Sequence, residues 1–225
     1  MATFFRSAKG WVALLLVILI LVIDQIVKIE VKTTMCLHES IRVTDWFYIS
    51  FVENNGMAYG MTFINKLVLT FFRMAAIAVI AVYLYRQVRK NARWVYVVCL
   101  ALVMAGAAGN LIDCIAYGQI FTASTSDTVA HFVPWGQGYE EVFRGRVVDM
   151  LYFPLFETDL PQWLPIWGGE HYIFFSPVFN IADSCITTGV ITLLLFCRKE
   201  LATISLSKKD EETGTSEGDG NTTES

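Results

Sequence analysis

Polar side chains recur at short, helical spacings inside apolar stretches of this sequence. Three pairs stand three or four residues apart: Asp24 and Lys28, Asn110 and Asp113, and Asn180 and Asp183. Residues at these spacings share one face of a helix. A further carboxylate, Asp149, lies among hydrophobic residues in segment 146–153, RVVDMLYF. The groups available for chemistry are therefore mainly carboxylates.

Carboxylates in this pattern support two different functions. Two carboxylates about 3 Å apart share one proton, so the ionised one can accept a proton from water while the protonated one hydrogen-bonds a scissile carbonyl. A partly dry site raises the higher pKa further. A proton-coupled carrier subunit, which is not an enzyme, uses the same residue types. The residue types alone leave the peptidase and the carrier open.

We expect no metal centre in this chain. The three histidines lie far apart, and the five cysteines form no Cys-x-x-Cys pair. Cys99, Cys185 and Cys197 lie in apolar runs and are expected to be core residues, whereas Cys36 and Cys114 are expected to meet water.

The composition indicates a membrane protein. Of the 225 residues 55% are hydrophobic and 17% are charged, whereas a soluble domain has about a quarter charged. Four segments approach the roughly 20 apolar residues that a spanning helix needs: 11–31, 67–85, 94–112 and 178–197. No small-residue cleavage site follows the first, so we interpret it as a retained span. Arg73, inside the second, is interpreted as reaching outward to the membrane surface.

The charges of the sequence are unevenly distributed. Residues 207–225 carry six acidic and two basic side chains, which accounts for the whole net charge of -4. The balanced remainder lacks the basic footprint of a nucleic-acid-binding protein.

Lysine and arginine gather on one side of the predicted spans. Ten lie before the first span, between the second and third, or after the fourth, against five in the long loops 32–66 and 113–177. This places both termini in the cytoplasm and both loops outside. The ionisable residues then gather at the outer ends of the spans, which favours an enzyme, because a carrier needs them near the bilayer midplane.

The outer loops are predicted to carry a small sheet. Segment 45–61 alternates in polarity around a turn signal at Asn54, Asn55 and Gly56, and segment 146–153 is typical of a second strand. Segments 119–145 and 154–176 are expected to be irregular and to lie at the membrane interface.

The expected fold class is therefore membrane α-helical, with four transmembrane helices, a small extracytoplasmic β-sheet and an interfacial loop. The expected divisions are a cytoplasmic N-terminus at 1–10, the four-helix domain at 11–204 and a disordered acidic tail at 205–225.

Five short motifs occur in a fixed order along the chain. They are DQIVK at 24–28, NGMAYG at 55–60, GNLID at 109–113, VVD at 147–149 and FNIADS at 179–184. Together they resemble the bacterial lipoprotein signal peptidase (signal peptidase II) family over residues 11–198. Each motif alone is weak evidence for the family, but the order of the five motifs and their position at the predicted outer ends of the spans are specific to it.

The resemblance implies an aspartic endopeptidase of the bacterial inner membrane. Such enzymes cut diacylglyceryl-modified prolipoproteins before the lipidated cysteine, need no metal or organic cofactor, and are blocked by the cyclic peptide globomycin. The family's catalytic pair falls on Asp149 and Asp183. Its supporting positions fall on Asp24, Lys28, Asn54 or Asn55 with Gly56, Asn110, Asp113 and Asn180.

The chain departs from the family pattern in three places. Cys114 stands where the family has an arginine after the GNLID motif. A guanidinium can brace carboxylates or substrate carbonyls, so we hypothesise that Arg146 or Arg144 supplies the missing charge. Segment 119–145 resembles an insertion and segment 154–176 is long, and both are expected to enlarge an outer lid over the site.

Overall fold

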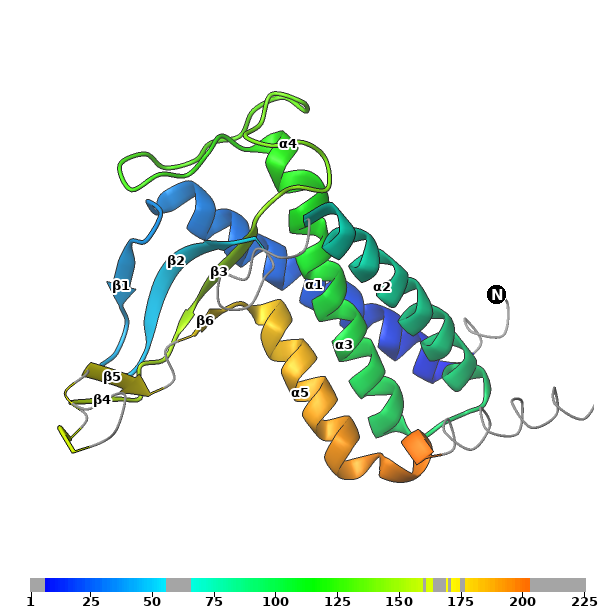
Figure 1. The fold of residues 1–225 in the computed structure, drawn as a ribbon. Helices are drawn as coiled ribbons and strands as arrows, with labels where there is room; N and C mark the ends of the chain where they lie inside the picture. Colours follow the sequence, from blue (N-terminus) through cyan, green and yellow to red (C-terminus); the bar gives the residue numbers. More distant parts are fainter. Residues whose placement is uncertain are drawn as a thin grey trace, which may run out of the picture.

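Within the residues that the computed structural model describes, four long helices form a bundle with a small sheet at one end (Figure 1). These residues are 7–55, 66–159, 161–163, 169, 171–174 and 177–202. The helices are α1 (Ala8–Thr34), α2 (Lys66–Arg89), α3 (Trp94–Ile112) and α5 (Ile181–Phe196). Helix α3 is central because it packs against α1, α2 and α5.

Helices α1 and α2 keep much of their apolar surface exposed. Leu19 and Ile26 of α1, and Phe72 and Val79 of α2, are each more than half exposed. An apolar surface of this extent suits contact with lipid. By length and composition α1, α2 and the helical stretch Trp94–Ile120 can each cross a membrane.

The fourth predicted span is shorter than expected. Segment 178–197 begins with strand β6 (Val178–Phe179), and α5 starts only at Ile181. Asn180 separates the two, because its Oδ1 accepts a hydrogen bond from the Asp183 backbone N at 2.8 Å and caps the helix. The 16 residues of α5 leave it shorter than the other three helices.

Close packing of α3 against α5 depends on glycine. A Cβ on Gly106 of α3 would lie 2.2 Å from the backbone oxygen of Ala182. A Cβ on Gly189 of α5 would lie 2.8 Å from the Cγ2 methyl of Val103. Small residues at such interfaces let two helix backbones approach, and at Gly106 this brings the first turn of α5 against α3.

The sheet contains the two strands that the sequence predicts. Antiparallel strands lie in the order β1 (Ser40–Arg42), β2 (Tyr48–Asn54), β3 (Val147–Tyr152) and β6. The register between β2 and β3 is irregular between Ile49 and Val52. Strand β2 ends at Asn54, where the turn signal begins, and Gly56 of that signal lies outside the described residues.

Segment 119–145 is irregular, as predicted, and it is anchored by aromatic side chains. It begins within the short helix α4 (Gly118–Ile120), which follows a π-helical turn, η2 (Asp113–Tyr117). Phe121 and Tyr139 pack with Val31 of α1, Phe51 of β2 and Met150 of β3. The segment therefore contributes to the core between α1 and the sheet.

Segment 154–176 differs from the expectation. It contains an antiparallel pair, β4 (Phe156–Asp159) and β5 (His171–Phe174), because backbone pairing forms here without a clear alternation of polarity. Residues 160, 164–168, 170 and 175–176 of this segment, and those of the predicted tail 205–225, lie outside the described residues.

Cys114, expected to meet water, is instead buried. It lies in the η2 turn, where the backbone of Gly145 covers it and donates to its carbonyl oxygen at 2.9 Å. The side chain of Arg73 approaches from α2, and its Nη1 donates to the Cys114 sulfur at 3.3 Å. Arg73 is thus partly buried against the η2 turn, whereas the sequence predicted that it would reach outward to the membrane surface.

Candidate active site

Lys28 lies at the centre of the polar residues at the sheet end of the bundle. Its side chain is wholly buried, and its Nζ lies 2.9 Å from Asp24 Oδ2 and 2.8 Å from Asp113 Oδ2. It also donates to Asn110 Oδ1 at 2.8 Å. The i, i+4 spacing brings Asp24 and Lys28 onto one face of α1, and that face meets the polar end of α3.

Asp24 connects α1 to the other two helices. Its Oδ1 accepts a hydrogen bond from the backbone N of Ala182 at 2.9 Å, in the first turn of α5. A Cβ on Gly109 would lie 2.7 Å from its Oδ2, so only glycine leaves room for this carboxylate. Asp24 therefore fixes the start of α5 relative to α1 and α3.

Two carboxamides link Asp149 to Asp183. Asn180 Nδ2 donates to Asp149 Oδ1 at 2.6 Å, and Asn110 Nδ2 donates to Asp183 Oδ1 at 2.7 Å. The carboxamides also meet each other, because Asn180 Nδ2 lies 3.1 Å from Asn110 Oδ1. A chain of hydrogen bonds therefore joins the aspartate of β3 to the aspartate of α5.

The environment of Asp149 favours its protonated form. Burial, and then the nearby Asp183 carboxylate, raise the pKa of Asp149 to about 7, against the opposite effect of hydrogen bonds from Asn54 and Asn180. Asn54 lies at the end of β2, and its Nδ2 donates to Asp149 Oδ2 at 3.3 Å. Carboxyl groups with a raised pKa, close to a second carboxylate, are typical of acid–base sites.

Most of the predicted site residues come together here. The group comprises Asp24, Lys28, Asn54, Asn110, Asp113, Asp149, Asn180 and Asp183. Asn55 lies at the edge of the group, where Lys66 Nζ donates to its Oδ1 at 3.2 Å.

The two arginines proposed to replace the family arginine make other contacts. Arg146 Nη1 donates to Glu53 Oε2 at 3.0 Å, and Arg144 Nε lies 3.5 Å from Glu141 Oε2. The guanidinium that lies against Cys114 belongs to Arg73. Arg73 is distant in sequence from the motif, so spacing along the chain could not have indicated it.

Sequence reasoning also missed Gln25. Its Nε2 donates to Asp113 Oδ1 at 2.9 Å, and its Oε1 accepts from the Tyr117 hydroxyl at 3.1 Å. Its place directly after Asp24 in the DQIVK motif was the available signal. Within the part of the chain that the structure describes, no group of three His, Cys, Asp or Glu side chains is placed to hold a metal ion.

Comparisons with known proteins agree with one another. The family model described as signal peptidase (SPase) II matches residues 16–198. A lipoprotein signal peptidase of Porphyromonas gingivalis is 48% identical over 219 residues, covering 96% of each chain. One from Amoebophilus asiaticus is 34% identical over 197 residues, covering 84% of this chain and 78% of that one.

Solved structures give the same picture of the fold. A bacterial membrane enzyme solved at 1.9 Å resolution aligns with a TM-score of 0.53 and 27% identity, covering 82% of this chain and 90% of that chain. A second, solved at 2.3 Å, aligns with a TM-score of 0.52 and 25% identity, covering 95% and 94%.

Proposed function

Because the chain belongs to the signal peptidase II family, we propose that it is an intramembrane aspartic endopeptidase. Its substrates are diacylglyceryl-modified prolipoproteins, from which it removes the signal peptide by cutting before the lipidated cysteine. The observation that carries the proposal is the hydrogen-bonded chain from Asp149 through Asn180 and Asn110 to Asp183. The family and the grouping of ionisable residues at one end of the bundle both favour this function over a proton-coupled carrier.

The two aspartates share the acid and base roles. Asp149, whose pKa is raised to about 7, supplies the protonated carboxyl group that hydrogen-bonds the scissile carbonyl. Ionised Asp183 accepts a proton from water as the water oxygen attacks the carbonyl carbon. The C–N bond then breaks as the proton that Asp183 took from water passes to the leaving nitrogen, which becomes the amino terminus of the lipidated cysteine. Asn110 and Asn180 hold the two carboxyl groups in place.

Lys28 stabilises the arrangement electrostatically. Its ammonium lies between the Asp24 and Asp113 carboxylates and donates to Asn110. Its single positive charge offsets part of the negative charge of these two buried carboxylates beside the catalytic pair. Asn110 Oδ1 accepts a hydrogen bond from Lys28, and this orients Asn110 Nδ2 to donate a hydrogen bond to Asp183.

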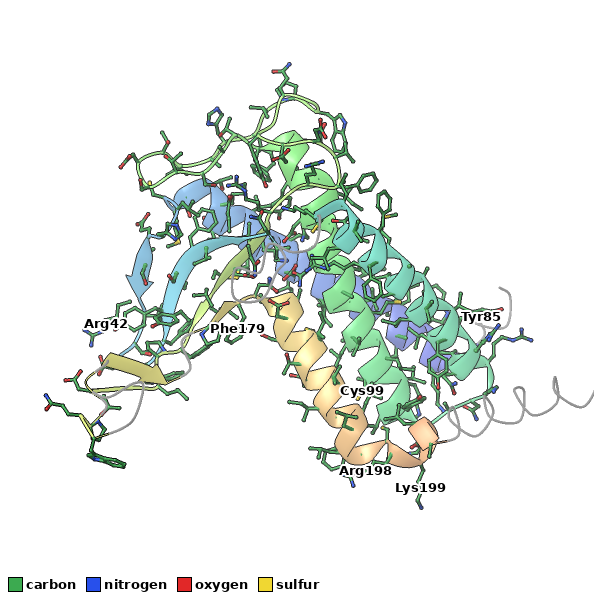
Figure 2. The ribbon with its side chains drawn as sticks, in the orientation of Figure 1. Arg42, Tyr85, Cys99, Phe179, Arg198 and Lys199 are labelled. Atoms are coloured by element: carbon green, nitrogen blue, oxygen red, sulfur yellow. The ribbon has the colours of Figure 1, made fainter. Side chains whose placement is uncertain are left out.

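The proposed topology has four spans in the bacterial inner membrane, with both termini in the cytoplasm. In Figure 2, Phe179 lies where the sheet meets α5, whereas Arg198 and Lys199 lie at the far end of that helix. Basic residues at this far end support a cytoplasmic location. The sheet and the aspartates then face the outer leaflet, where a lipid-anchored substrate and water can both reach them.

The test is cleavage of a lipidated prolipoprotein peptide by the purified protein, followed as a gel shift with and without globomycin. Asp149→Asn and Asp183→Asn should each abolish cleavage while the protein stays folded in membranes. Asp127→Asn is the matched control, because Asp127 is an exposed aspartate of segment 119–145. Retained turnover in either site variant would remove that residue from the catalytic pair.

A further inference from the structure

A second buried charge cluster lies beside the proposed catalytic pair. The Glu53 cluster consists of Lys32, Glu53, Ser124, Tyr139 and Arg146. Lys32 is wholly buried, and the Glu53 side chain is 2% exposed. The cluster joins the end of α1, strand β2, segment 119–145 and the residue before β3.

Glu53 accepts hydrogen bonds from three different parts of the chain. Lys32 Nζ and Ser124 Oγ both donate to its Oε1, the latter at 3.0 Å, and Arg146 Nη1 donates to its Oε2 at 3.0 Å. Lys32 also lies over the rings of Phe121 and Tyr139, at 5.4 and 5.0 Å from their centroids. Both oxygens of the carboxylate are therefore occupied.

The cluster contains one anion, Glu53, and two cations, Lys32 and Arg146. Burial alone would raise the pKa of Glu53, but the Lys32 ammonium and the hydrogen bonds from its partners hold that pKa below its usual value. Glu53 is therefore ionised at neutral pH. Removing its charge would leave the buried Lys32 without an anion, which is strongly unfavourable.

The backbone connects this cluster to Asp149. Glu53 pairs with Val148 across β2 and β3, and Asn54 pairs with Val147. Successive side chains of a strand point to opposite faces. Glu53 therefore faces Lys32, while the next residue, Asn54, faces Asp149 and donates to its Oδ2 at 3.3 Å.

We propose, on the basis of the proposed function, that Glu53 is a positioning residue for Asp149. Held by Lys32, Ser124 and Arg146, it fixes the end of β2 so that Asn54 donates to Asp149. Segment 119–145 then acts as a brace for the site, because it supplies Ser124 and Tyr139. Arg146 takes part in the brace and does not replace the family arginine.

The readout is the pH dependence of cleavage, which reports on Asp149. The charged and polar groups that face Asp149 are Asp183 of α5, Lys28 of α1, and the carboxamides of Asn54 and Asn180. The hydrogen bond from Asn54 lowers the pKa of Asp149. If Asn54 loses its position, the pKa of Asp149 rises and the alkaline limit of activity moves to higher pH.

The experiment compares Glu53→Gln with Glu30→Gln, which neutralises an exposed carboxylate of α1. We expect Glu53→Gln to lower kcat at least tenfold with little change in KM, and to move the alkaline limit upward in the same direction as Asn54→Ala. Glu30→Gln should match the unmodified protein. A folded Glu53→Gln enzyme with unchanged kcat and pH profile would overturn the proposal.

A double-variant cycle separates positioning from general stability. If Glu53 acts through Asn54, the combined variant should be little worse than Asn54→Ala alone, whereas independent effects would multiply. Multiplied effects would overturn the proposal. Should Glu53→Gln fail to accumulate, Arg146→Gln replaces it, because the Lys32–Glu53 pair remains intact and the same shift in pH profile is expected.

The two proposals can fail separately. Loss of cleavage in Asp149→Asn together with an unchanged Glu53→Gln enzyme would leave the proposed function standing and overturn only the role of Glu53. Retained cleavage in Asp149→Asn would overturn the proposed function first.

Discussion

The two ends of the helix bundle use ion pairs in opposite ways. At the end that carries Arg198, Arg93 pairs with Glu200 at 3.2 Å where the arginine is largely exposed, and Lys9 donates to the Ala92 carbonyl at 2.6 Å. At the sheet end, Lys28 is wholly buried between two carboxylates. Exposed pairs contribute about 0–1 kcal/mol, whereas breaking a buried pair costs about 3–5 kcal/mol. Ion pairs therefore contribute little at the exposed end of the bundle, whereas at the sheet end they are buried and form part of the site.

The largest effect should come from the buried cation. Lys28→Met leaves Asp24 and Asp113 buried without a positive partner, so we expect a loss of about 3–5 kcal/mol in the free energy of unfolding, together with loss of cleavage. Thermal unfolding in detergent can be followed by reaction of the buried Cys99 and Cys197 with a thiol dye. Lys90→Met, at an exposed position, is the control. A loss below about 1 kcal/mol is the value expected of an exposed ion pair, and it would contradict the view that these charges are shielded from water.

Helix packing should show the next largest effect. Gly106→Ala places a methyl group 2.2 Å from the Ala182 backbone oxygen, and overpacking of this kind costs about 1–3 kcal/mol. The methyl group of Gly189→Ala would lie 2.8 Å from a side-chain methyl and 2.9 Å from the Cys99 backbone oxygen, so its clash is milder and it should cost less. The same thiol assay compares them, and equal losses would contradict the view that the start of α5 is the tighter contact.

The pH dependence of cleavage should reflect Asp149. Its pKa is raised to about 7, so it is protonated below that pH and loses its proton as the pH rises. Because the mechanism needs that proton, cleavage should fall about tenfold per pH unit on the alkaline side. Initial rates between pH 5 and pH 9 (approximately the range in which such a group titrates) measure this. A rate that keeps rising through this range would rule out Asp149 as the acid.

The smallest effect is expected at the other end. Arg93→Ala removes the pair with Glu200, in which the arginine is largely exposed, and it should change the free energy of unfolding by less than about 1 kcal/mol and leave cleavage unchanged. High salt should have little further effect on the variant. A loss comparable to that of Lys28→Met would show that the two ends are not distinguished by burial.

The sequence predicts those parts of the site that depend on local spacing. Asp24 with Lys28, and Asn180 with Asp183, are close in sequence and belong to helix ends, so their grouping could be inferred. The pairing of Lys32 with Glu53 and the contact of Arg73 with Cys114 depend on how separate elements pack, and no spacing indicates them. The late start of α5 follows from the Asn180 cap, which hydropathy does not report.

The short α5 has a consequence for the surrounding lipid. Sixteen helical residues span about 24 Å, whereas the hydrocarbon core of a bilayer is about 30 Å thick. In the proposed topology, acyl chains beside this helix must compress to match it. Asp183 lies in the first turn of this helix, so thinning there would bring headgroups and water closer to it, and a substrate anchored by its own lipid would meet hydrolytic water without leaving the leaflet.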